Sequence, residues 1–570
     1  MINPNVILII LDSLCFKSLG FSGRSDVTSI SPFLDKLSQK GLSLHNCFTS
    51  GAPTSFAYPG IMTSTYPLDL GGFDYGMRNR KSHLAEDFKL NGYKTYMFFE
   101  TWFGAGRKYD AGFDEIFYMY DLYQFTAGGI RDRFGHFINY KDQNFLEGED
   151  FLIFLEKDYL RTLNEVEEYL EKTNNDIEKG EIIKSTLITP YNYVDIIGEI
   201  REYKKEFLAD PQKFINDILK GDQGFFKILS KYRDKVKALD DSCTLHKNYK
   251  KLLRPYYRSL LKSGWRSPKR LRQQIRNTLP YYRNPQQNSK NYATAEYLKQ
   301  NLVKQLKGHD HKEPLFAVIH TVDIHERNFF SHDILNNDKV LEEELELAQE
   351  FIKKDASNSM YKGNLLYDLS VKYTDKKIQD LFEELDAINI DETNTVFAIV
   401  ADHGLTESKS PQRKGSHIAR DFYDELYHIP AIFYGKGVPN INEFGLSSNV
   451  DIPSTLLSLS NCEVPYHYRG LKVNEPGFKR DHVIMDHTGP GPCVMSCKNK
   501  FICIRDHKFK IIYKVNVGFR MDAGEYIALY DLEKDPEELR NLIETVKVPK
   551  YLNEICLKRA NEIAYDMMKS

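Results

Sequence analysis

Short apolar segments alternate with segments of helical period along most of the chain. The apolar runs read NVILIILD (5–12), YKTYMFF (93–99), PLFAVIHTVD (314–323), TVFAIVADHG (395–404) and IPAIFYG (429–435). The segments before the second and fourth runs, HLAEDFKLNG and SVKYTDKKIQDLFEELDAI, have the spacing of amphipathic helices. Strands that are apolar on both faces and alternate with helices are typical of a mainly parallel sheet. The pattern therefore predicts an α/β fold.

Polar side chains stand at the ends of three of these runs. Asp12 closes the first, His320 and Asp323 lie at the end of the third, and Asp402 and His403 lie at the end of the fourth. Parallel sheets bind their ligands beyond the carboxyl ends of the strands. We therefore expect these side chains to belong to one site.

The pattern divides the chain into three parts. Residues 1–120 and 311–475 form the predicted core, and residues 121–310 form a charged, mostly helical insert without a comparable strand run. Residues 476–570 are predicted to form a small α+β subdomain, in which 501–515 is a pair of strands. Its segment 526–543 is predicted to contain a strand, a turn and a helix that begins at Asp535-Pro536.

The insert contains a basic stretch, 246–283, in which no Asp or Glu occurs and aromatic residues are interleaved. It is either a solvated helical face that pairs with acidic segments such as 341–350, or a surface for an anionic partner, such as lipid headgroups or a polyanion. The net charge of the whole chain is only -3. No specific nucleic-acid partner is therefore predicted.

Composition describes an ordinary globular protein. The eight cysteines among 570 residues are too sparse for a disulfide framework. The apolar run 5–12 is too short to span a membrane and lacks the preceding basic residues of a signal peptide. These features favour a cytoplasmic protein, with peripheral contact to a membrane surface left open, and they indicate no oligomeric state.

Segment 51–67, GAPTSFAYPGIMTSTYP, places two hydroxyls, Thr54 and Ser55, at a predicted helix start. Thr54 is either an N-cap or a nucleophile at a helix N-terminus, where an anion is stabilised. Together with Asp12, Asp402 and His403 it makes an oxygen and nitrogen ligand set for a divalent metal. Mn²⁺ or Zn²⁺ is favoured, Mg²⁺ and Ca²⁺ also fit, and one ion is favoured over two. Such a set suits phosphoryl or sulfuryl ester chemistry.

Taken in order, several segments resemble those of a sulfatase-type member of the alkaline phosphatase superfamily. They are NVILIILDSL, APTSFAYPGIMTSTYP, GYKTYMFF with DAGFDEIF, PLFAVIHTVDIH, TVFAIVADHG, YDELYHIPAIFYG and LYDLEKDPEELRNL. The resemblance covers nearly the whole chain except the helical insert. It implies an alkaline phosphatase-like core with a long helical insert and a small C-terminal α+β subdomain.

The chain departs from the sulfatases at the nucleophile. Aligning 63–67 with the Thr-Gly-Arg-Tyr-Pro of the family places Thr54 where sulfatases carry the Cys or Ser that is converted to formylglycine. Thr54 cannot undergo that conversion, and Phe56 and Tyr58 replace the Pro and Arg that it needs. Ser13 also replaces the second Asp of the Asp-Asp pair of the family.

A metal-bound Thr is similar to other branches of the superfamily, namely lipoteichoic acid synthases, phosphoethanolamine transferases and nucleotide pyrophosphatase/phosphodiesterases. Those enzymes act through a covalent phospho-threonine, and in the first two an acidic residue, a Thr, an Asp and a His bind one metal. The resemblance also implies that His325, in VDIH, faces the substrate, and that His417 lies ahead of the Tyr-Asp-Glu segment. Either imidazole is suited to bind or protonate the leaving oxygen.

His320 and Asp323 either support the metal ligands from behind or belong to a second metal site. A two-metal arrangement would use Asp323, His325 and His417. We predict a metal-dependent hydrolase or transferase of phosphate esters (phosphodiester, phosphonate ester, or phosphoglycan or phospholipid type) that acts through phospho-Thr54 on an anionic ester. The alternatives are a sulfuric ester hydrolase that uses Thr54 or Ser55 unmodified, and an inactive binding protein that docks to anionic surfaces through 246–283.

Overall fold

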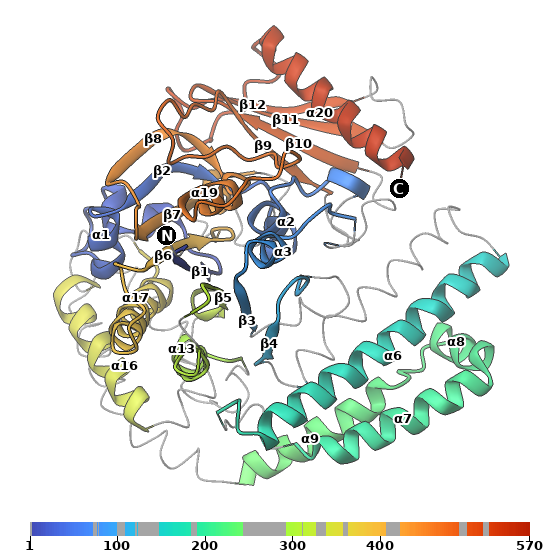
Figure 1. The fold of residues 1–570 in the computed structure, drawn as a ribbon. Coiled ribbons are helices and arrows are strands. Elements are labelled where there is room, and N and C mark those ends of the chain that lie inside the picture. The colour runs from blue at the N-terminus through green and yellow to red at the C-terminus, as the bar shows by residue number, and fades with distance from the viewer. Residues whose placement is uncertain are drawn as a thin grey trace.

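The computed structural model describes residues 3–71, 77, 79–99, 109–119, 122, 148–183, 191–242, 292–309, 312–326, 338–356, 363–405, 422–488, 499–516 and 524–569. Within these ranges the chain forms two β-sheets and a separate group of helices (Figure 1). No helix among the described residues combines the length and the apolar character that crossing a lipid bilayer requires.

The large sheet has eight strands in the order β4-β3-β5-β1-β6-β7-β2-β8. Its strands are β1 (Asn5–Leu11), β2 (Leu42–Phe48), β3 (Lys94–Phe99), β4 (Glu115–Tyr118), β5 (Leu315–Thr321), β6 (Thr395–Ala401), β7 (His428–Gly435) and β8 (Ile441–Ser448). All neighbours pair in parallel except that β7 is antiparallel to both β6 and β2. The predicted α/β fold with a mainly parallel sheet is confirmed.

Helices cover both faces of this sheet (Figure 1). One face carries α1 (Pro32–Ser38), α13 (Ala295–Leu306), α16 (Asp338–Phe351) and α17 (Leu365–Asp386), and the other carries α2 (Thr54–Thr63), α3 (Leu84–Leu90) and α19 (Asp451–Leu459). Short helices link the strands: η1 (Phe16–Ser18), η2 (Gly20–Ser22), η3 (Asp69–Gly71), α14 (Asp323–Glu326), η7 (Ile352–Ala356) and α18 (Asp424–Tyr427). The strands β1, β5 and β6 are therefore buried on both faces, as their apolar sequences predicted.

The register of the central strands aligns the polar residues that follow them. Leu11 pairs with Thr321 on one side and with Ala401 on the other, so Asp12 and Asp402 come next at the same edge. His320 pairs with Ile10. Because side chains alternate with a period of two along a strand, His320 points to the same face of the sheet as positions 10 and 12.

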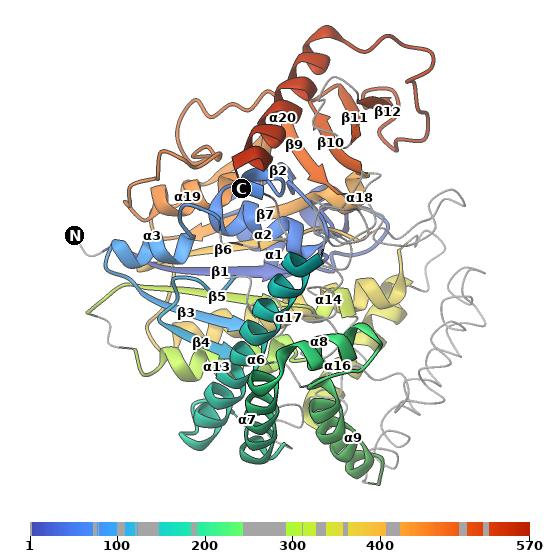
Figure 2. The same ribbon diagram turned by 90° about the vertical axis from the view of Figure 1, so that its right-hand side faces the viewer.

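Within the predicted insert, 121–310, four described helices form a separate group: α6 (Gly148–Glu178), α7 (Tyr193–Ala209), α8 (Pro211–Leu219) and α9 (Phe226–Ser242). A fifth, α13, also lies in this range but packs on the large sheet. The group of four has its own apolar core, which includes Leu163, Ile200 and Phe225. Figure 2 shows these helices at the opposite end of the molecule from the C-terminal sheet. The helical character predicted for the insert holds for these residues, whereas the basic stretch 246–283 lies outside the described residues.

The C-terminal part is a four-stranded antiparallel sheet with one long helix. The strands are β9 (Val483–His487), β10 (Asn499–Arg505), β11 (Phe509–Asn516) and β12 (Glu525–Asp531), in the order β12-β11-β10-β9, and α20 (Lys550–Lys569) packs on them. The predicted α+β subdomain and its strand pair are present.

The helix predicted to begin at Asp535-Pro536 is wrong, because 536–543 forms turns. Glu538 has a positive φ of 53° and is buried. Its carboxylate accepts hydrogen bonds from the buried Lys510 ammonium and from the backbone N–H of Asp424. This buried ion pair turns the backbone inward and ends any helical run at that point.

Arg559 of α20 joins the C-terminal part to the core. Its side chain is 1% exposed and forms ion pairs with Asp69 of η3 and Asp486 of β9. The guanidinium also lies over the Tyr66 ring, 4.9 Å from its centroid. Burial raises the pKa of Asp69, but the nearby Arg559 and Arg469 outweigh that effect and hold it below its usual range.

We predict that Arg559→Met lowers the unfolding free energy by about 3–5 kcal/mol, because Asp486 would remain buried without this counter-ion and Asp69 would keep only its weaker pair with Arg469. Urea denaturation followed by circular dichroism measures the change. Arg469→Met is the matched control, since Arg469 also pairs with Asp69 but its side chain is 36% exposed, and we expect a loss below about 1 kcal/mol. Equal losses in the two variants would contradict the assignment of Arg559 as the buried link.

Candidate active site

Thr54 is the first residue of α2, and its side chain does not cap the helix. The N-cap position is Pro53, and α2 has no side-chain cap. Thr54 is 4% exposed, and its Oγ1 lies 3.3 Å from His403 Nε2. The N–H groups of a first helical turn have no acceptor within the helix. The N-cap interpretation of Thr54 is therefore wrong, and its hydroxyl stands at a helix N-terminus suited to an anion.

Two side chains fix the position of α2. Asn449 accepts a hydrogen bond from the Ser50 N–H at 2.9 Å and donates to the Ala57 carbonyl at 3.0 Å. Pro59 lies inside the helix and has no N–H for the Ser55 carbonyl. That carbonyl instead accepts a hydrogen bond from the Tyr109 hydroxyl at 3.4 Å. The helix that carries Thr54 is thus held from both sides despite its internal proline.

Asp12 follows β1 and is 4% exposed. The next residue, Ser13, has a φ of 68°, and this turn points two of its groups at the carboxylates. The Ser13 hydroxyl donates to Asp12 Oδ1 at 2.7 Å, and its N–H donates to Asp402 Oδ1 at 3.1 Å. The Tyr367 hydroxyl of α17 donates to the Ser13 carbonyl at 2.9 Å. Ser13 therefore orients both acids at once.

Asp402 and His403 follow β6 and are fully buried. His403 Nδ1 lies 2.7 Å from the Gly404 carbonyl, which can only accept, so this nitrogen carries a proton. The other ring nitrogen, Nε2, faces Thr54 Oγ1, Asp12 Oδ1 at 3.6 Å and Asp402 Oδ2 at 3.5 Å. The structure thus brings together Asp12, Thr54, Asp402 and His403, the four residues predicted to hold a metal.

His320 joins this group from β5. Its Nε2 lies 4.0 Å from Asp402 Oδ2, and one ligand atom each from Asp12, His320 and Asp402 lie within 4.8 Å of one another. From the sequence, His320 was expected either to support the metal ligands or to belong to a second metal site. His320 pairs with Ile10 and therefore points to the same face of the sheet as Asp12, two residues further along the neighbouring strand. This register is the signal that places His320 beside Asp12.

The donor set fits a divalent metal. Asp402 Oδ2 is buried and receives no hydrogen bond of normal geometry from the described residues, although a buried carboxylate oxygen requires a partner. Burial raises the pKa of Asp402, but the charges of His403 and His320 outweigh it and hold the pKa well below its usual range. Asp402 is therefore an anion at neutral pH, next to a second carboxylate and to imidazole nitrogens. Such carboxylate and imidazole sets bind Mn²⁺ or Zn²⁺.

His325, on α14, faces the same charges. Burial lowers the pKa of His325, but Asp12, Glu326 and Asp402 outweigh it and raise the pKa to about 9. Its Nδ1 lies 2.9 Å from Glu326 Oε1. A dication beside Asp12 and Asp402 would offset part of this effect. His325 is thus a candidate proton donor near the acids.

Other predicted residues do not join the group. Asp323 Oδ2 accepts hydrogen bonds from the Ala295 N–H at 2.7 Å and from the Thr321 hydroxyl. Among the described residues no metal-ligand group joins Asp323 with His325. His417, predicted to assist the leaving group, lies in 406–421, outside the described residues.

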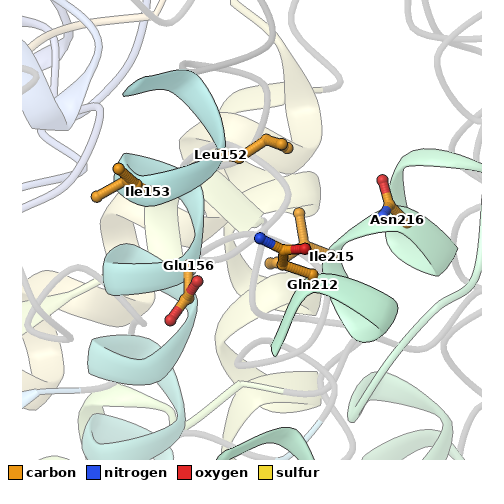
Figure 3. A pocket seen from close by; sticks show the side chains of 6 residues that line it. All are labelled: Leu152, Ile153, Glu156, Gln212, Ile215 and Asn216. Carbon is orange, nitrogen blue, oxygen red and sulfur yellow. The ribbon is translucent and has the colours of Figure 1, made fainter. Parts of the chain in front are cut away.

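A separate hollow lies on the helical insert, between α6 and α8 (Figure 3). It is lined by Leu152, Ile153, Glu156, Gln212, Ile215 and Asn216 and encloses about 230 Å³. Only Glu156 among these side chains is ionisable, and none lies on the large sheet. It therefore lacks the donor set found at Asp12 and Asp402.

Comparisons with known proteins identify the family of the chain. The family model described as Sulfatase matches residues 4–177 and 225–462. A delta 4,5-hexuronate-2-O-sulfatase of Bacteroides thetaiotaomicron is 27% identical over 173 residues, which are 28% of this chain and 33% of that enzyme. The chain thus aligns with only about a third of the length of this curated relative.

Solved structures show the same fold. BT4656, solved in complex with its substrate D-glucosamine-2-N,6-O-disulfate, is 13% identical, with a TM-score of 0.50 over 100% of this chain and 99% of that chain. Protein yidJ of Bacteroides fragilis, assigned to the sulfatases, is 14% identical, with a TM-score of 0.50 over 99% and 98%. At these identities the likeness concerns the fold alone.

We predict that Ser13→Ala weakens Mn²⁺ binding about 10- to 100-fold, as the loss of other supporting hydrogen bonds to metal ligands does. The variant loses the bond from the hydroxyl to Asp12 and keeps the N–H bond to Asp402. Isothermal titration calorimetry measures the Kd. Ser43→Ala removes another buried hydroxyl, which lies in β2 and bonds to Asn442 of the edge strand β8, and should leave the Kd unchanged. Equal Kd values for Ser13→Ala and wild type would refute the orienting role.

Proposed function

This chain belongs to the sulfatase family, whose model matches more than half of its residues, and from that premise we propose that it is a metal-dependent hydrolase or transferase of phosphate esters. Its substrate would be an anionic ester of the phosphodiester, phosphonate ester, phosphoglycan or phospholipid type. The reaction would pass through a phosphoryl group bound covalently to Thr54.

The observation that supports this proposal is the placement of the Thr54 hydroxyl. It lies 3.3 Å from His403 Nε2 at the N-terminus of α2. The resemblance of 63–67 to the motif of the family aligns Thr54 with the residue that becomes formylglycine. Oxidation of a threonine side chain would give a ketone, so the aldehyde of formylglycine cannot form there. An intact hydroxyl beside a buried dication site is a nucleophile for phosphoryl transfer.

Asp12, Thr54, Asp402 and His403 would hold the metal, with His320 as a further ligand or as a support for Asp402. A dication bound by these groups supplies Lewis acidity, which lowers the pKa of a hydroxyl and polarises the ester. We favour Mn²⁺ or Zn²⁺ because the set mixes carboxylates with imidazole. The N-terminus of α2 would hold the remaining negative charge of the phosphoryl group.

In the first step Thr54 Oγ would form a bond to phosphorus as the bond from phosphorus to the leaving oxygen breaks. The leaving oxygen keeps the electron pair of that bond and takes a proton from His325. The hydroxyl proton of Thr54 passes to solvent. His325 is suited to this role because Asp12, Glu326 and Asp402 favour its protonated form.

In the second step water, or an acceptor hydroxyl, would attack phosphorus and break its bond to Thr54 Oγ. His325, now neutral, would take the proton of the attacking hydroxyl, and Thr54 would regain a proton from solvent. Water gives free phosphate from a phosphomonoester, a phosphomonoester from a phosphodiester, or phosphonate from a phosphonate ester, and an acceptor hydroxyl gives a new ester. Both outcomes share one intermediate, so hydrolase and transferase activities differ only in access of the acceptor.

A sulfuric ester hydrolase is the second candidate. The family match and the sulfatase from Bacteroides thetaiotaomicron favour it. It would have to use Thr54 unmodified, because Phe56 and Tyr58 occupy the positions of the Pro and Arg required for formylglycine formation.

We predict that Thr54→Ala lowers turnover of p-nitrophenyl phosphate, its phosphodiester or its phosphonate ester, measured with Mn²⁺, by at least about 10³-fold, because the covalent route is lost. Thr54→Ser keeps a hydroxyl and should retain most activity. Acid quenching of the wild type with a radioactive phosphorus ester, followed by peptide mapping, should place the label on Thr54.

Three results would count against this proposal. Turnover of p-nitrophenyl sulfate alone would favour the sulfuric ester hydrolase, and full phosphoester turnover by Thr54→Ala would exclude this nucleophile. Protein that binds metal but turns over no simple ester, and yields no labelled Thr54, would also count against the proposal.

We predict that His325→Gln lowers kcat about 10²- to 10⁴-fold and removes the alkaline limb of the pH profile. A proton donor is active below its pKa, so the rate of the wild type should fall as the pH rises through that value. A metal bound by Asp12 and Asp402 would lower the pKa of His325 from the value of about 9 that these acids and Glu326 give it. We therefore expect the alkaline limb of the wild type below pH 9. The test is kcat against pH for both proteins, with a phenol leaving group of low pKa as the control, since such a substrate needs less protonation. An alkaline limb that persists in His325→Gln would assign it to another group.

A further inference from the structure

The first turn of α17 is bonded to the segment that follows β1, although the proposed reaction assigns no role to this helix. Its residue Tyr367 is 3% exposed. The Tyr367 hydroxyl donates a hydrogen bond to the Ser13 carbonyl at 2.9 Å and accepts one from the Cys15 N–H at 2.9 Å. One hydroxyl thus satisfies two backbone groups of a buried segment, where groups without partners would be costly.

The backbone that this hydroxyl holds is strained at Ser13. Its φ of 68° is a left-handed conformation, which a residue with a side chain adopts at a cost. The same turn directs the Ser13 N–H to Asp402 and the Ser13 hydroxyl to Asp12. Such a conformation persists only where the surroundings fix it. The Tyr367 hydroxyl provides one fixed contact on each side of Leu14.

Tyr367 is itself fixed by its place in the helix. It lies in the first turn of α17, where its N–H donates to the Asn364 side chain at 3.3 Å. The next residue, Asp368, is 2% exposed and accepts hydrogen bonds from the Arg24 guanidinium at 2.8 and 2.7 Å. Arg24 also belongs to the segment after β1. The start of α17 therefore holds this segment at two points.

Cys15 extends this support to the turn after β6. The Leu405 N–H donates to the Cys15 sulfur at 3.1 Å, and this sulfur lies 3.3 Å from the Glu425 carbonyl oxygen. The preceding Gly404 leaves no room for a side chain, because a Cβ there would lie 2.2 Å from that carbonyl oxygen and 3.1 Å from the sulfur. The turns that follow β1 and β6 are therefore packed against each other through Cys15.

We propose that Tyr367 is a positioning residue of the metal site: its hydroxyl holds the turn that carries Asp12 and, through Cys15, seats it against the turn that follows β6. The inference rests on the proposed function in one respect, namely that a dication binds at Asp12 and Asp402. Because the separation of these carboxylates decides how well a cation fits, the Tyr367 contacts would set the metal affinity. Burial raises the pKa of the Tyr367 hydroxyl well above its usual value, so the hydroxyl remains a donor at neutral pH.

Hydrogen exchange of the metal-free, full-length protein tests the contacts themselves. Tyr367→Phe keeps the ring and removes the hydroxyl, so the Cys15 N–H loses its acceptor. We expect mass spectrometry of a peptide that contains 12–16 to show exchange about 10-fold faster than in the wild type. Tyr93→Phe is the matched control, since Tyr93 is also 3% exposed and its hydroxyl donates to the Pro4 carbonyl at 2.9 Å, before the start of β1. It should leave exchange in 12–16 unchanged.

Isothermal titration calorimetry with Mn²⁺ tests the effect on the site. Tyr367→Phe should raise the Kd about 10-fold, the lower end of the effect seen when a support of metal ligands is removed. Tyr93→Phe should leave the Kd unchanged. The Tm of each variant is measured as well, because a residue with a merely structural role would lower the Tm without changing the Kd.

Substitutions of Cys15 give a second route if Tyr367→Phe does not fold. Cys15→Ala removes the acceptor of the Leu405 N–H and should weaken Mn²⁺ binding, whereas Cys15→Ser keeps an acceptor and should restore part of the affinity. Cys462→Ala is the control and should leave the Kd unchanged. Cys462 is 7% exposed, against 8% for Cys15, and its thiol bonds to the Ser460 carbonyl at 3.6 Å within its own turn.

Three results would overturn the proposal. The first is exchange in 12–16 that is equally fast in Tyr367→Phe and in the wild type. The second is a Kd for Mn²⁺ that neither Tyr367→Phe nor Cys15→Ala changes, and the third is wild-type protein that binds no Mn²⁺. Failure of the proposed function alone has a different signature. Wild-type protein that turns over no phosphorus ester, but whose Kd for Mn²⁺ responds to Tyr367→Phe, would contradict the reaction and not the role of Tyr367.

Discussion

The structure depends on the parallel pairing of β1 between β5 and β6. This pairing places Asp12 and Asp402 side by side at one sheet edge, with His320 on the same face. Two carboxylates so close together repel each other, and the apolar strands that carry them keep water out. Ser13 offsets part of that repulsion by donating hydrogen bonds to both acids, and the imidazoles of His403 and His320 lie beside Asp402. The segments that follow β1 and β6 therefore enclose two neighbouring negative charges.

The fold could be predicted where both faces of a strand are buried. The five continuous apolar runs became β1, β3, β5, β6 and β7, within three residues at each end. The remaining strands of the large sheet gave no such signal. Segment 441–448, INEFGLSS, forms the edge strand β8, and its first half is largely exposed. An exposed edge strand does not need a continuous apolar sequence, and this segment has the composition of a loop. Edge strands of this kind are specified by their neighbours more than by their own sequence.

The site could be predicted only as far as chain position reveals it. Asp12, Asp402 and His403 directly follow apolar runs, and the structure brings them together with Thr54. His320 was harder to place because it lies within a strand, where only the register shows which face it occupies. Tyr367 precedes the segment whose spacing predicts a helix, SVKYTDKKIQDLFEELDAI, and nothing in the sequence links it to Asp12. Its hydroxyl bonds join parts of the chain 352 and 354 residues apart, which one segment read alone cannot reveal.

The ion pairs of Arg559 also have a consequence for the way the molecule unfolds. Asp69 and Asp486 lie far apart in the sequence, yet one guanidinium binds both. Detachment of α20 would remove that charge from both buried acids at once, so the C-terminal sheet and the neighbouring part of the core should loosen together. The helix that begins with Thr54 leads into the segment that carries Asp69. A contact far from the metal ligands in the sequence therefore couples the stability of the C-terminal part to that of the nucleophile helix.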